Sequence, residues 1–338
     1  MKILVTGGAG FIGSNIVDAY VEAGHAVVAI DDLNTGSGKN VNPKAHFYKM
    51  DIRDAWLSDL FATEQFDVIN HQAARGNVRA SMEDPMVYAD VNVRGGINLL
   101  ECSRKYGVRK FIYASTGGCV YGEPTYLPAD EKHPIVPRDP YGASKASFEL
   151  YLPVYAINYG LKYTILRYPN VYGPRQDPFG EAGVVSIFIG QMLRGIQPVI
   201  NGDGEQLRDY IFVSDVVRAN VLVLEKGDNE VFNLGSGRGT SVNEIFRSLK
   251  RILGSEVDEV HGPPKLGEVR QTYLNAERGH KMLGWTPVFS LEEGLQGTAE
   301  FFRPIIAARK EEVRRTIADL NLSQPRLGSE LRNTDTNS

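Results

Sequence analysis

Tyr141 and Lys145, in the run Tyr-Gly-Ala-Ser-Lys, carry side chains that can move a proton at a substrate oxygen. Residues four apart share one face of a helix, so the Lys145 ammonium can lie beneath the Tyr141 phenol. A free tyrosine, with a pKa of about 10, is a poor base at neutral pH, but a nearby cation favours the phenolate. Thr116, upstream, carries a hydroxyl that could bond the same oxygen. The three residues predict general acid–base chemistry.

A glycine-rich turn near the start of the chain predicts a pyrophosphate site. Ile3-Leu4-Val5 is typical of a short buried strand, residues 6–13 read Thr-Gly-Gly-Ala-Gly-Phe-Ile-Gly, and helical periodicity follows. Backbone N–H groups of such a turn, together with the helix N-terminus, favour a pyrophosphate. A second predicted strand, residues 26–30, ends at Asp31, where an acid accepts hydrogen bonds from an adenosine ribose. Because that carboxylate repels a 2′-phosphate, we expect NAD rather than NADP.

Length and composition narrow the class of protein. The 338 residues exceed an average domain and predict a cofactor domain with a smaller partner. A net charge of −4 gives no reason to expect a nucleic-acid partner. Two cysteines predict no disulfide framework, and the short apolar start predicts neither a signal peptide nor a membrane span, so we expect a cytoplasmic location. The histidines lack metal-ligand spacing, so no metal is expected.

Predicted strands and helices alternate, as an α/β fold with a doubly wound parallel sheet requires. We expect a Rossmann domain over residues 1–170, a smaller α/β substrate domain over 171–303, and a polar tail over 304–338 whose last dozen residues are disordered. Strands at Asp209–Val213 and Val231–Leu234 are expected to rejoin the first domain. The other predicted strands are His46–Lys49, Phe66–Asn70, Lys110–Ser115 and Tyr163–Tyr168, and the helices are Ala55–Thr63, Asp84–Tyr106 and Ser144–Tyr159, with Asn170–Gly183 a loop.

Ordered motifs over about residues 1–303 resemble the extended short-chain dehydrogenase/reductase family, in its nucleotide-sugar 4-epimerase branch. They are TGGAGFIG at 6–13, HQAA at 71–74, STGG at 115–118, VYG at 120–122, YGASK at 141–145, RYPNVYGPRQDP at 167–178, GDG at 202–204 and RDY at 208–210. The resemblance implies an isomerase that interconverts UDP-glucose and UDP-galactose through a transient 4-keto sugar with tightly bound NAD. It also implies a homodimer, with no nucleic-acid or membrane partner.

The resemblance further implies a role for each matched position. The catalytic residues would be Thr116, Tyr141 and Lys145. The cofactor-binding residues would be Gly7, Gly10, Phe11, Ile12, Asp31, Asp32, Asn34, Asp51, Ile52, Ala73, Ala74, Asn92, Tyr141, Lys145 and Tyr168. The substrate-binding residues would be Thr116, Gly117, Asn170, Val185, Arg208, Arg270 and Thr272.

Other activities stay open at this stage. A UDP-glucuronate 4-epimerase would share fold and cofactor. A 4,6-dehydratase needs an acid–base pair just after Thr116, and a decarboxylase a carboxylate there, where this chain has Gly117 and Gly118. A non-catalytic NAD-binding scaffold would not need Thr116, Tyr141 and Lys145 together.

Three positions carry separate expectations. Alignment through Gly267 and Glu268 puts Thr272 beside the sugar C2 substituent, where threonine leaves room for a 2-acetamido group, so the N-acetylated pair is also an expected substrate. Arg75 stands where the family commonly has an uncharged residue, and we expect it to point to solvent. Pro153 is expected to kink a helix that the resemblance places in the dimer interface.

Overall fold

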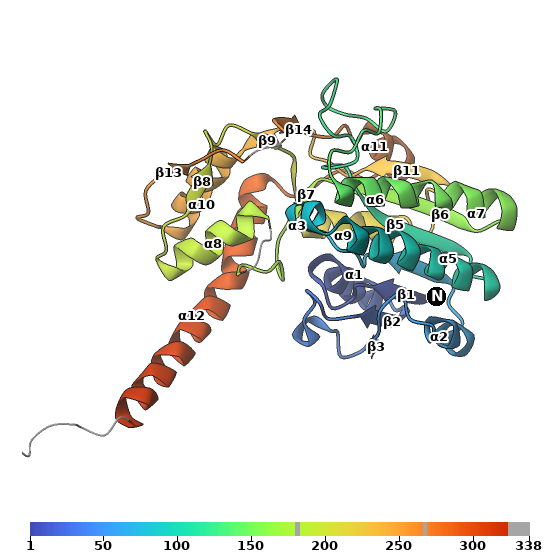
Figure 1. Ribbon diagram of the computed structural model, residues 1–338, viewed down its shortest axis with the longest axis horizontal. Helices are drawn as coiled ribbons and strands as arrows, with labels where there is room; N and C mark the ends of the chain where they lie inside the picture. Colours follow the sequence, from blue (N-terminus) through green and yellow to red (C-terminus); the bar gives the residue numbers. More distant parts are fainter. Residues whose placement is uncertain (180–182, 266–268, 324–338) are drawn as a thin grey trace, which may run out of the picture.

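The computed structural model describes residues 1–179, 183–265 and 269–323, with the backbone alone for 317–323. The chain forms two parts that lie side by side (Figure 1). The larger part holds the central sheet and the N-terminus, and the smaller part holds helices α8, α10 and α12.

Within the described residues, the centre of the larger part is a seven-stranded parallel sheet in the order β11-β6-β5-β4-β1-β2-β3. All residues of β5 and β4 are buried, as expected for strands covered on both faces. The direction of winding reverses between β1 and β4, which opens a crevice at the carboxyl ends of the strands. The strands are β1 Lys2–Thr6, β2 Ala26–Asp31, β3 His46–Lys49, β4 Val68–His71, β5 Lys110–Thr116, β6 Lys162–Tyr168 and β11 Glu230–Asn233.

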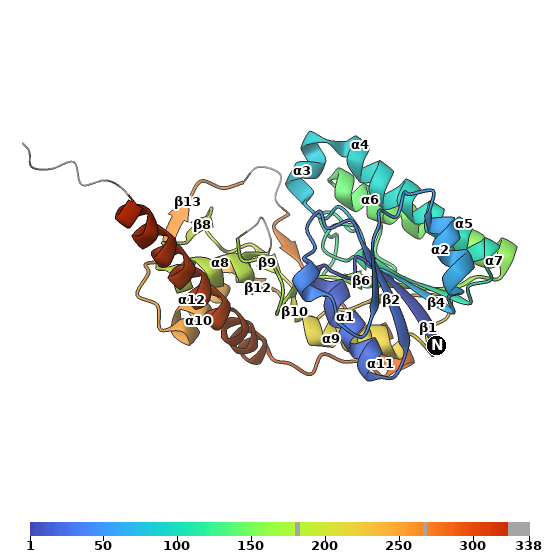
Figure 2. The same ribbon diagram turned by 90° about the horizontal axis from the view of Figure 1, so that it is seen from below.

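Helices cover both faces of this sheet (Figure 2). Successive side chains of a strand point to opposite faces, so Ile3 and Val5 pack with Val216 of α9, whereas Leu4 packs with Leu99 of α5. The helices of this part are α1 Phe11–Glu22, α2 Leu57–Glu64, α3 Val78–Glu83, α4 Pro85–Tyr88, α5 Gly95–Lys105, α6 Pro140–Glu149, α7 Tyr151–Tyr159, α9 Val213–Leu222 and α11 Glu277–Leu283, with the 3-10 turn η1 Gly38–Asn40 and the π-helical turn η2 Ala89–Arg94.

The smaller part packs three helices around its own core, which includes Phe188, Phe246, Leu295 and Phe302. The helices are α8 Val184–Arg194, α10 Val242–Leu253 and α12 Leu291–Ser323. Short strands lie at the edge of this smaller part. One of them, β7 Asn170–Tyr172, pairs with β10 Tyr210–Phe212 where the two parts meet. The others are β8 Val199–Asn201, β9 Leu207–Arg208, β12 Thr240–Ser241, β13 Val260–Gly262 and β14 Gln271–Thr272.

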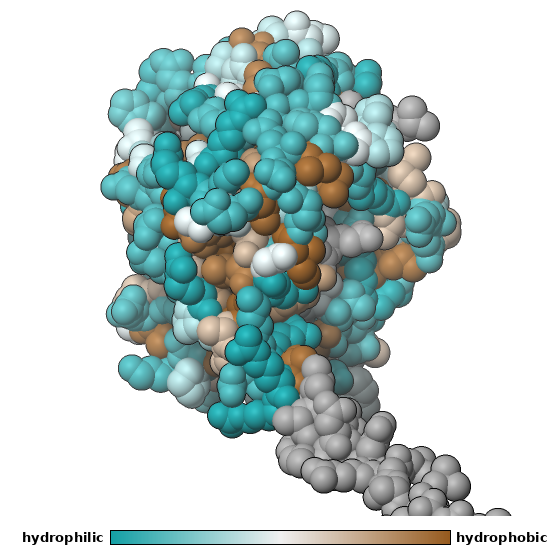
Figure 3. All heavy atoms as spheres, turned by 90° about the vertical axis from the view of Figure 1, so that its left-hand side faces the viewer, coloured by the Kyte–Doolittle hydropathy of each residue, from teal (hydrophilic) through white to brown (hydrophobic). Residues whose placement is uncertain are grey.

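The surface on the side of the smaller part is mostly hydrophilic, with hydrophobic side chains in small groups (Figure 3). Among the described residues, no helix combines the length and the apolar content that a bilayer crossing requires.

The predicted strand at 231–234 joins the central sheet as β11, beside β6, as expected. The strand predicted at 209–213 does not: as β10 it pairs with β7, inside the segment expected to be a loop. The polar tail expected from residue 304 begins as helix, because α12 continues through Pro304 to Ser323. The dozen residues expected to be disordered lie outside the described part of the chain.

The helix predicted from Ser144 begins four residues earlier, at Pro140, because Asp139 caps it: its Oδ1 accepts a hydrogen bond from the Gly142 N–H at 2.7 Å. The expected kink is present as a break at Leu150, between α6 and α7. Pro153 lacks the N–H that would bond the carbonyl one turn earlier, which favours a break in the helix before it.

Candidate active site

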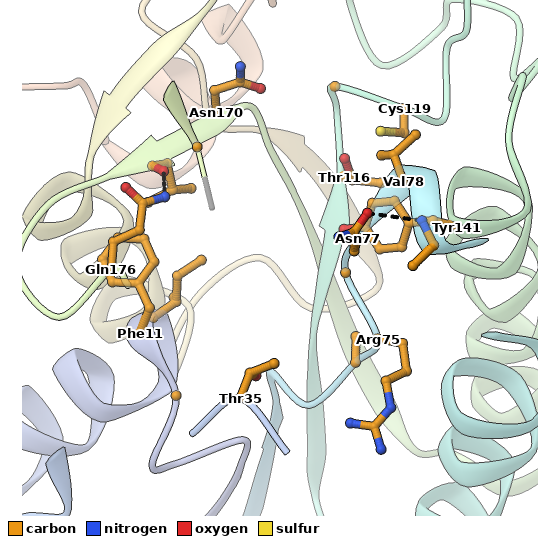
Figure 4. Close-up of a pocket in the computed structure, with 18 of the residues that line it drawn as sticks. Phe11, Thr35, Arg75, Asn77, Val78, Thr116, Cys119, Tyr141, Asn170 and Gln176 are labelled. Carbon is orange, nitrogen blue, oxygen red and sulfur yellow. Dashed lines mark hydrogen bonds between the residues drawn. The ribbon is translucent and has the colours of Figure 1, made fainter. Parts of the chain in front are cut away.

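A cavity of about 1710 Å³ lies where the carboxyl ends of the sheet strands face the smaller part (Figure 4). Pockets for one small ligand are typically about 300–1,000 Å³, so this cavity has room for two. The sequence-predicted residues on its wall are Gly7, Gly10, Phe11, Ile12, Asp31, Asp32, Asn34, Asp51, Ile52, Ala73, Ala74, Thr116, Tyr141, Lys145, Tyr168, Asn170 and Arg208.

Thr116 and Tyr141 lie together on one wall (Figure 4). Thr116 is the last residue of β5, and Tyr141 lies in the first turn of α6. Burial raises the pKa of Tyr141, while a hydrogen bond with the Thr116 hydroxyl acts in the opposite direction and favours the phenolate. Both hydroxyl groups can therefore contact one substrate oxygen.

Lys145 follows on α6, one turn after Tyr141, and is buried. Its ammonium donates a hydrogen bond to the Ala114 carbonyl oxygen at 2.6 Å and lies 4.8 Å from the centre of the Tyr113 ring. Burial lowers the pKa of Lys145 to about 7, and the Glu149 carboxylate opposes that change. Tyr141 and Lys145 share one helix, as their spacing predicts, although this helix begins before Ser144; the group that favours the Tyr141 phenolate is the Thr116 hydroxyl and not the Lys145 ammonium.

A buried ion pair stands beneath these residues. The Arg167 guanidinium on β6 binds both carboxylate oxygens of Glu149, at the end of α6. Glu149 also accepts a hydrogen bond from Ser115, and Arg167 donates one to the Tyr121 phenol at 2.8 Å. The pair links α6 to β5 and β6. It therefore keeps the Thr116 and Tyr141 hydroxyl groups in a fixed position relative to each other.

The glycine turn fits a dinucleotide pyrophosphate. Gly7 has φ of +68°, in the left-handed region that favours glycine. A Cβ on Gly13 would lie 2.1 Å from the Gly7 carbonyl oxygen, so only glycine lets α1 approach the turn. Gly10 is the N-cap of α1 and supplies no side-chain cap, so the positive end of the helix dipole faces the cavity.

Asp31, at the end of β2, lines the cavity and also binds the backbone of the glycine turn. Its two carboxylate oxygens accept hydrogen bonds from the N–H groups of Ala9 at 3.1 Å and Leu33 at 2.8 Å. Burial raises its pKa. Each oxygen keeps a second lone pair, which suits the hydroxyl groups of an adenosine ribose.

Arg75 does not point to solvent, contrary to our expectation. Its guanidinium pairs with Asp32 at 2.9 Å, at the same end of the cavity, and its backbone N–H donates to Asn92 Oδ1 at 2.8 Å. The ion pair joins the loops after β2 and β4. This ion pair could not be predicted from spacing, because the two residues are 43 positions apart.

Another part of the cavity wall comes from β7 and the smaller part. A Cβ on Gly118 would lie 3.5 Å from Asn170 Oδ1 and 3.7 Å from Thr116 Oγ1, so the Asn170 amide stands beside the Thr116–Tyr141 pair. Arg208 on β9 and Gln176 after β7 also line this region. Gln176 lies in the motif at 167–178, but the resemblance implies no role for it.

Five predicted site residues are not on the cavity wall of the described chain: Asn92, Gly117, Val185, Arg270 and Thr272. Asn92 lies behind the wall, where its Nδ2 donates to Ser144 Oγ at 2.9 Å. Val185 is buried in the core of the smaller part, and Val184 lines the cavity in its place.

The other three are engaged elsewhere. A Cβ on Gly117 would lie 2.4 Å from the Leu274 side chain. Arg270 binds Asp203 through two hydrogen bonds of 2.9 Å. Thr272 is buried in β14, which pairs with β9, so its side chain does not border the described cavity. Gly267 and Glu268, used to align it, lie outside the described residues.

A glycine turn, an acid at the end of β2 and a Tyr–Lys pair at the carboxyl ends of a parallel sheet define a dinucleotide-binding protein with an acid–base site. The model of the NAD dependent epimerase/dehydratase family matches residues 3–235. The chain belongs to this family.

The chain is also similar to individual proteins along nearly its whole length. A putative UDP-glucose 4-epimerase from Methanocaldococcus jannaschii is 49% identical over 301 residues, 89% of this chain and 98% of that one. A UDP-glucose 4-epimerase from Thermotoga maritima, solved with UDP-glucose, superposes with a TM-score of 0.89 at 51% identity, covering 90% of this chain and 100% of that one.

Two further solved structures are similar. The Thermus thermophilus UDP-glucose 4-epimerase in complex with NAD has a TM-score of 0.86 at 42% identity, over 90% of this chain and 99% of that one. A UDP-N-acetylglucosamine 4-epimerase from Methanobrevibacter ruminantium has a TM-score of 0.84 at 35% identity, over 89% of this chain and 97% of that one.

Proposed function

We propose that this chain is an NAD-dependent UDP-sugar 4-epimerase that interconverts UDP-glucose and UDP-galactose. The observation that carries the proposal is the position of Thr116 and Tyr141 side by side on the wall of a cavity that they share with the glycine turn. The similarity to UDP-glucose 4-epimerases over about nine tenths of the chain supports the choice of substrate.

The cofactor is held by the glycine turn at its pyrophosphate and by Asp31 at the adenosine ribose. When bound, NAD supplies reversible hydride transfer at the sugar C4. Tyr141 removes the proton from the C4 hydroxyl and returns it after the sugar has turned over, and Thr116 holds the same oxygen. Asn170 and Arg208 bind the nucleotide diphosphate, the arginine through charge-assisted hydrogen bonds.

A direct assay tests the proposal. The purified protein is incubated with UDP-galactose and, separately, with UDP-glucose, and the products are identified by proton NMR. Conversion of each sugar into the same equilibrium mixture, with NAD recovered from the denatured protein, is the expected result. Recovery of NADP, or no interconversion of either sugar, would contradict it.

The N-acetylated pair is a second candidate substrate. Similarity to a UDP-N-acetylglucosamine 4-epimerase favours it, and our argument from Thr272 does not, because that residue is not on the described wall. The same NMR assay with UDP-N-acetylglucosamine separates the two ranges of substrate.

Homodimerisation through α7 belongs to the same proposal. Leu150, just before α7, and Val154 and Ile157 within it are 71%, 49% and 83% exposed, which leaves an apolar patch on the outside of this helix and its start. Sedimentation of the wild type and of Ile157→Glu tests it: the variant should shift toward monomer.

We place the enzyme in the cytoplasm. Cys102 and Cys119 are both free thiols, which suits a reducing compartment.

A further inference from the structure

The ion pair between Arg75 and Asp32 connects two loops that lie on either side of the glycine turn. The strands are ordered β4-β1-β2 at this point of the sheet, so the turn that follows β1 lies between the loops that follow β4 and β2. The Arg75 guanidinium comes from the first of these loops and binds Asp32 Oδ2, from the second, at 2.9 Å. Both residues line the cavity, and their side chains are 22% and 31% exposed. The pair therefore stands between the cavity and solvent.

Both loops are in close contact with the glycine turn. A Cβ on Gly7 would lie 2.9 Å from the backbone nitrogen of Ala73, in the loop after β4. On the other side, Asp31 at the end of β2 accepts a hydrogen bond from the Ala9 N–H of the turn at 3.1 Å. The ion pair thus lies next to the part of the cavity where the turn holds the pyrophosphate and Asp31 holds the adenosine ribose.

Each end of the pair is held in place by hydrogen bonds of its own. The Asn92 side chain binds the Arg75 backbone twice: its Oδ1 accepts from the N–H at 2.8 Å, and its Nδ2 donates to the carbonyl oxygen at 3.1 Å. Asp32 Oδ1 accepts from the Asn34 N–H at 2.9 Å, which leaves Oδ2 for the guanidinium. Because both ends are positioned in advance, formation of the pair costs less conformational entropy. Asn92, behind the cavity wall, acts here through Arg75.

A 4-epimerase takes a hydride from its sugar and returns it to the same sugar, so the cofactor has to stay bound between the two transfers. We propose that the Arg75–Asp32 ion pair closes over the adenosine end of the bound dinucleotide and slows its release. The need to retain NAD rests on the proposed function. The Arg75 guanidinium points away from Thr116 and Tyr141 (Figure 4), so the pair acts on the residence time of the cofactor and not on the proton at the sugar.

The test measures the release of NAD from the purified holoenzyme in the absence of any sugar. The protein is mixed with an excess of radiolabelled NAD, and the label that it takes up is followed over time, since each site has to empty before it refills. Partly exposed ion pairs contribute modestly, so we expect Arg75→Gln to release NAD about two- to fivefold faster than the wild type. Arg247→Gln breaks an exposed ion pair with Glu259 on the smaller part and is the matched control, which should exchange at the wild-type rate.

A double-mutant cycle shows whether Arg75 acts through Asp32. Asp32→Asn keeps an oxygen for the Asn34 N–H and loses only the charge. If the pair acts as a unit, then Asp32→Asn, Arg75→Gln and the double variant all release NAD at about the same increased rate. If the two single effects multiply in the double variant, each residue binds NAD by itself and the inference is wrong. A wild-type release rate in Arg75→Gln would overturn it as well.

Arg75→Lys keeps the inference testable if Arg75→Gln does not fold or does not take up NAD. Lysine retains the charge but not the planar guanidinium, so this variant should release NAD more slowly than Asp32→Asn. Equal rates in Arg75→Lys and Asp32→Asn would mean that the cation does not hold the cofactor.

The two proposals fail in different ways. A wild type that interconverts UDP-glucose and UDP-galactose, with Arg75→Gln releasing NAD at the wild-type rate, overturns only the role of the ion pair. A wild type that interconverts neither sugar, with faster NAD release in Arg75→Gln, overturns the proposed function and supports the role of the pair.

Discussion

Tyr141→Phe is the substitution that tests the chemistry most directly. It removes one oxygen atom from a half-buried ring that lines the cavity beside Thr116. General acid–base groups contribute about 10²- to 10⁴-fold in rate, which corresponds to about 2.7–5.4 kcal/mol of activation free energy. We expect kcat for UDP-galactose epimerisation to fall by that factor. KM should change by less than about tenfold, since at most one neutral hydrogen bond to the substrate is lost.

The neighbouring ring of Tyr88 offers a matched control. It lines the same cavity, and its centroid lies 6.5 Å from that of Tyr141. Its hydroxyl donates to the Asn77 carbonyl oxygen at 2.6 Å, away from Thr116. Tyr88→Phe therefore removes the same atom from an adjacent tyrosine without touching the acid–base pair, and should keep kcat within about tenfold of wild type.

Initial rates are measured by a coupled assay for UDP-glucose, with NAD content and melting temperature checked for each variant. If Tyr141→Phe stays within about tenfold of the wild-type kcat, the proton moves by another route. Equal losses in both variants would instead indicate disturbed packing of the cavity wall.

Three further outcomes are expected. Asp31→Ser should release NAD during gel filtration and narrow the preference for NAD over NADP, because the variant loses the carboxylate near the ribose; unchanged retention and preference would contradict its role. Since Gly117 and Gly118 supply no acid or base, NMR should detect no 4-keto-6-deoxy sugar after incubation with UDP-glucose; its accumulation would favour a dehydratase. Burial raises the pKa of Asp209 to about 6, so its contribution to stability is present below about pH 4 and lost as the pH rises through 6. The wild-type melting temperature should therefore fall relative to Asp209→Asn between about pH 4 and pH 7, and parallel curves would argue against this assignment.

Much of the fold was predictable because its signals are local. A buried strand, a glycine turn and a periodic helix lie within the first 22 residues, and the structure has them as β1, the turn and α1. The β11 strand was recognisable from its own apolar residues. The pairing of β10 with β7 was not, because the sequence of a short strand does not say which neighbour will bond to it.

The sequence by itself determined which residues are candidates for acid–base chemistry. The spacing of Tyr141 and Lys145 predicts one shared helical face, and Thr116 follows a predicted strand, although both elements extend further than predicted. Only the tertiary structure decided which other side chains reach the cavity: it pairs Arg75 with Asp32, leaves one oxygen of Gln176 without a described partner, and buries Thr272 in a small sheet. These outcomes depend on distances between segments far apart in the chain, and packing sets those distances where spacing cannot.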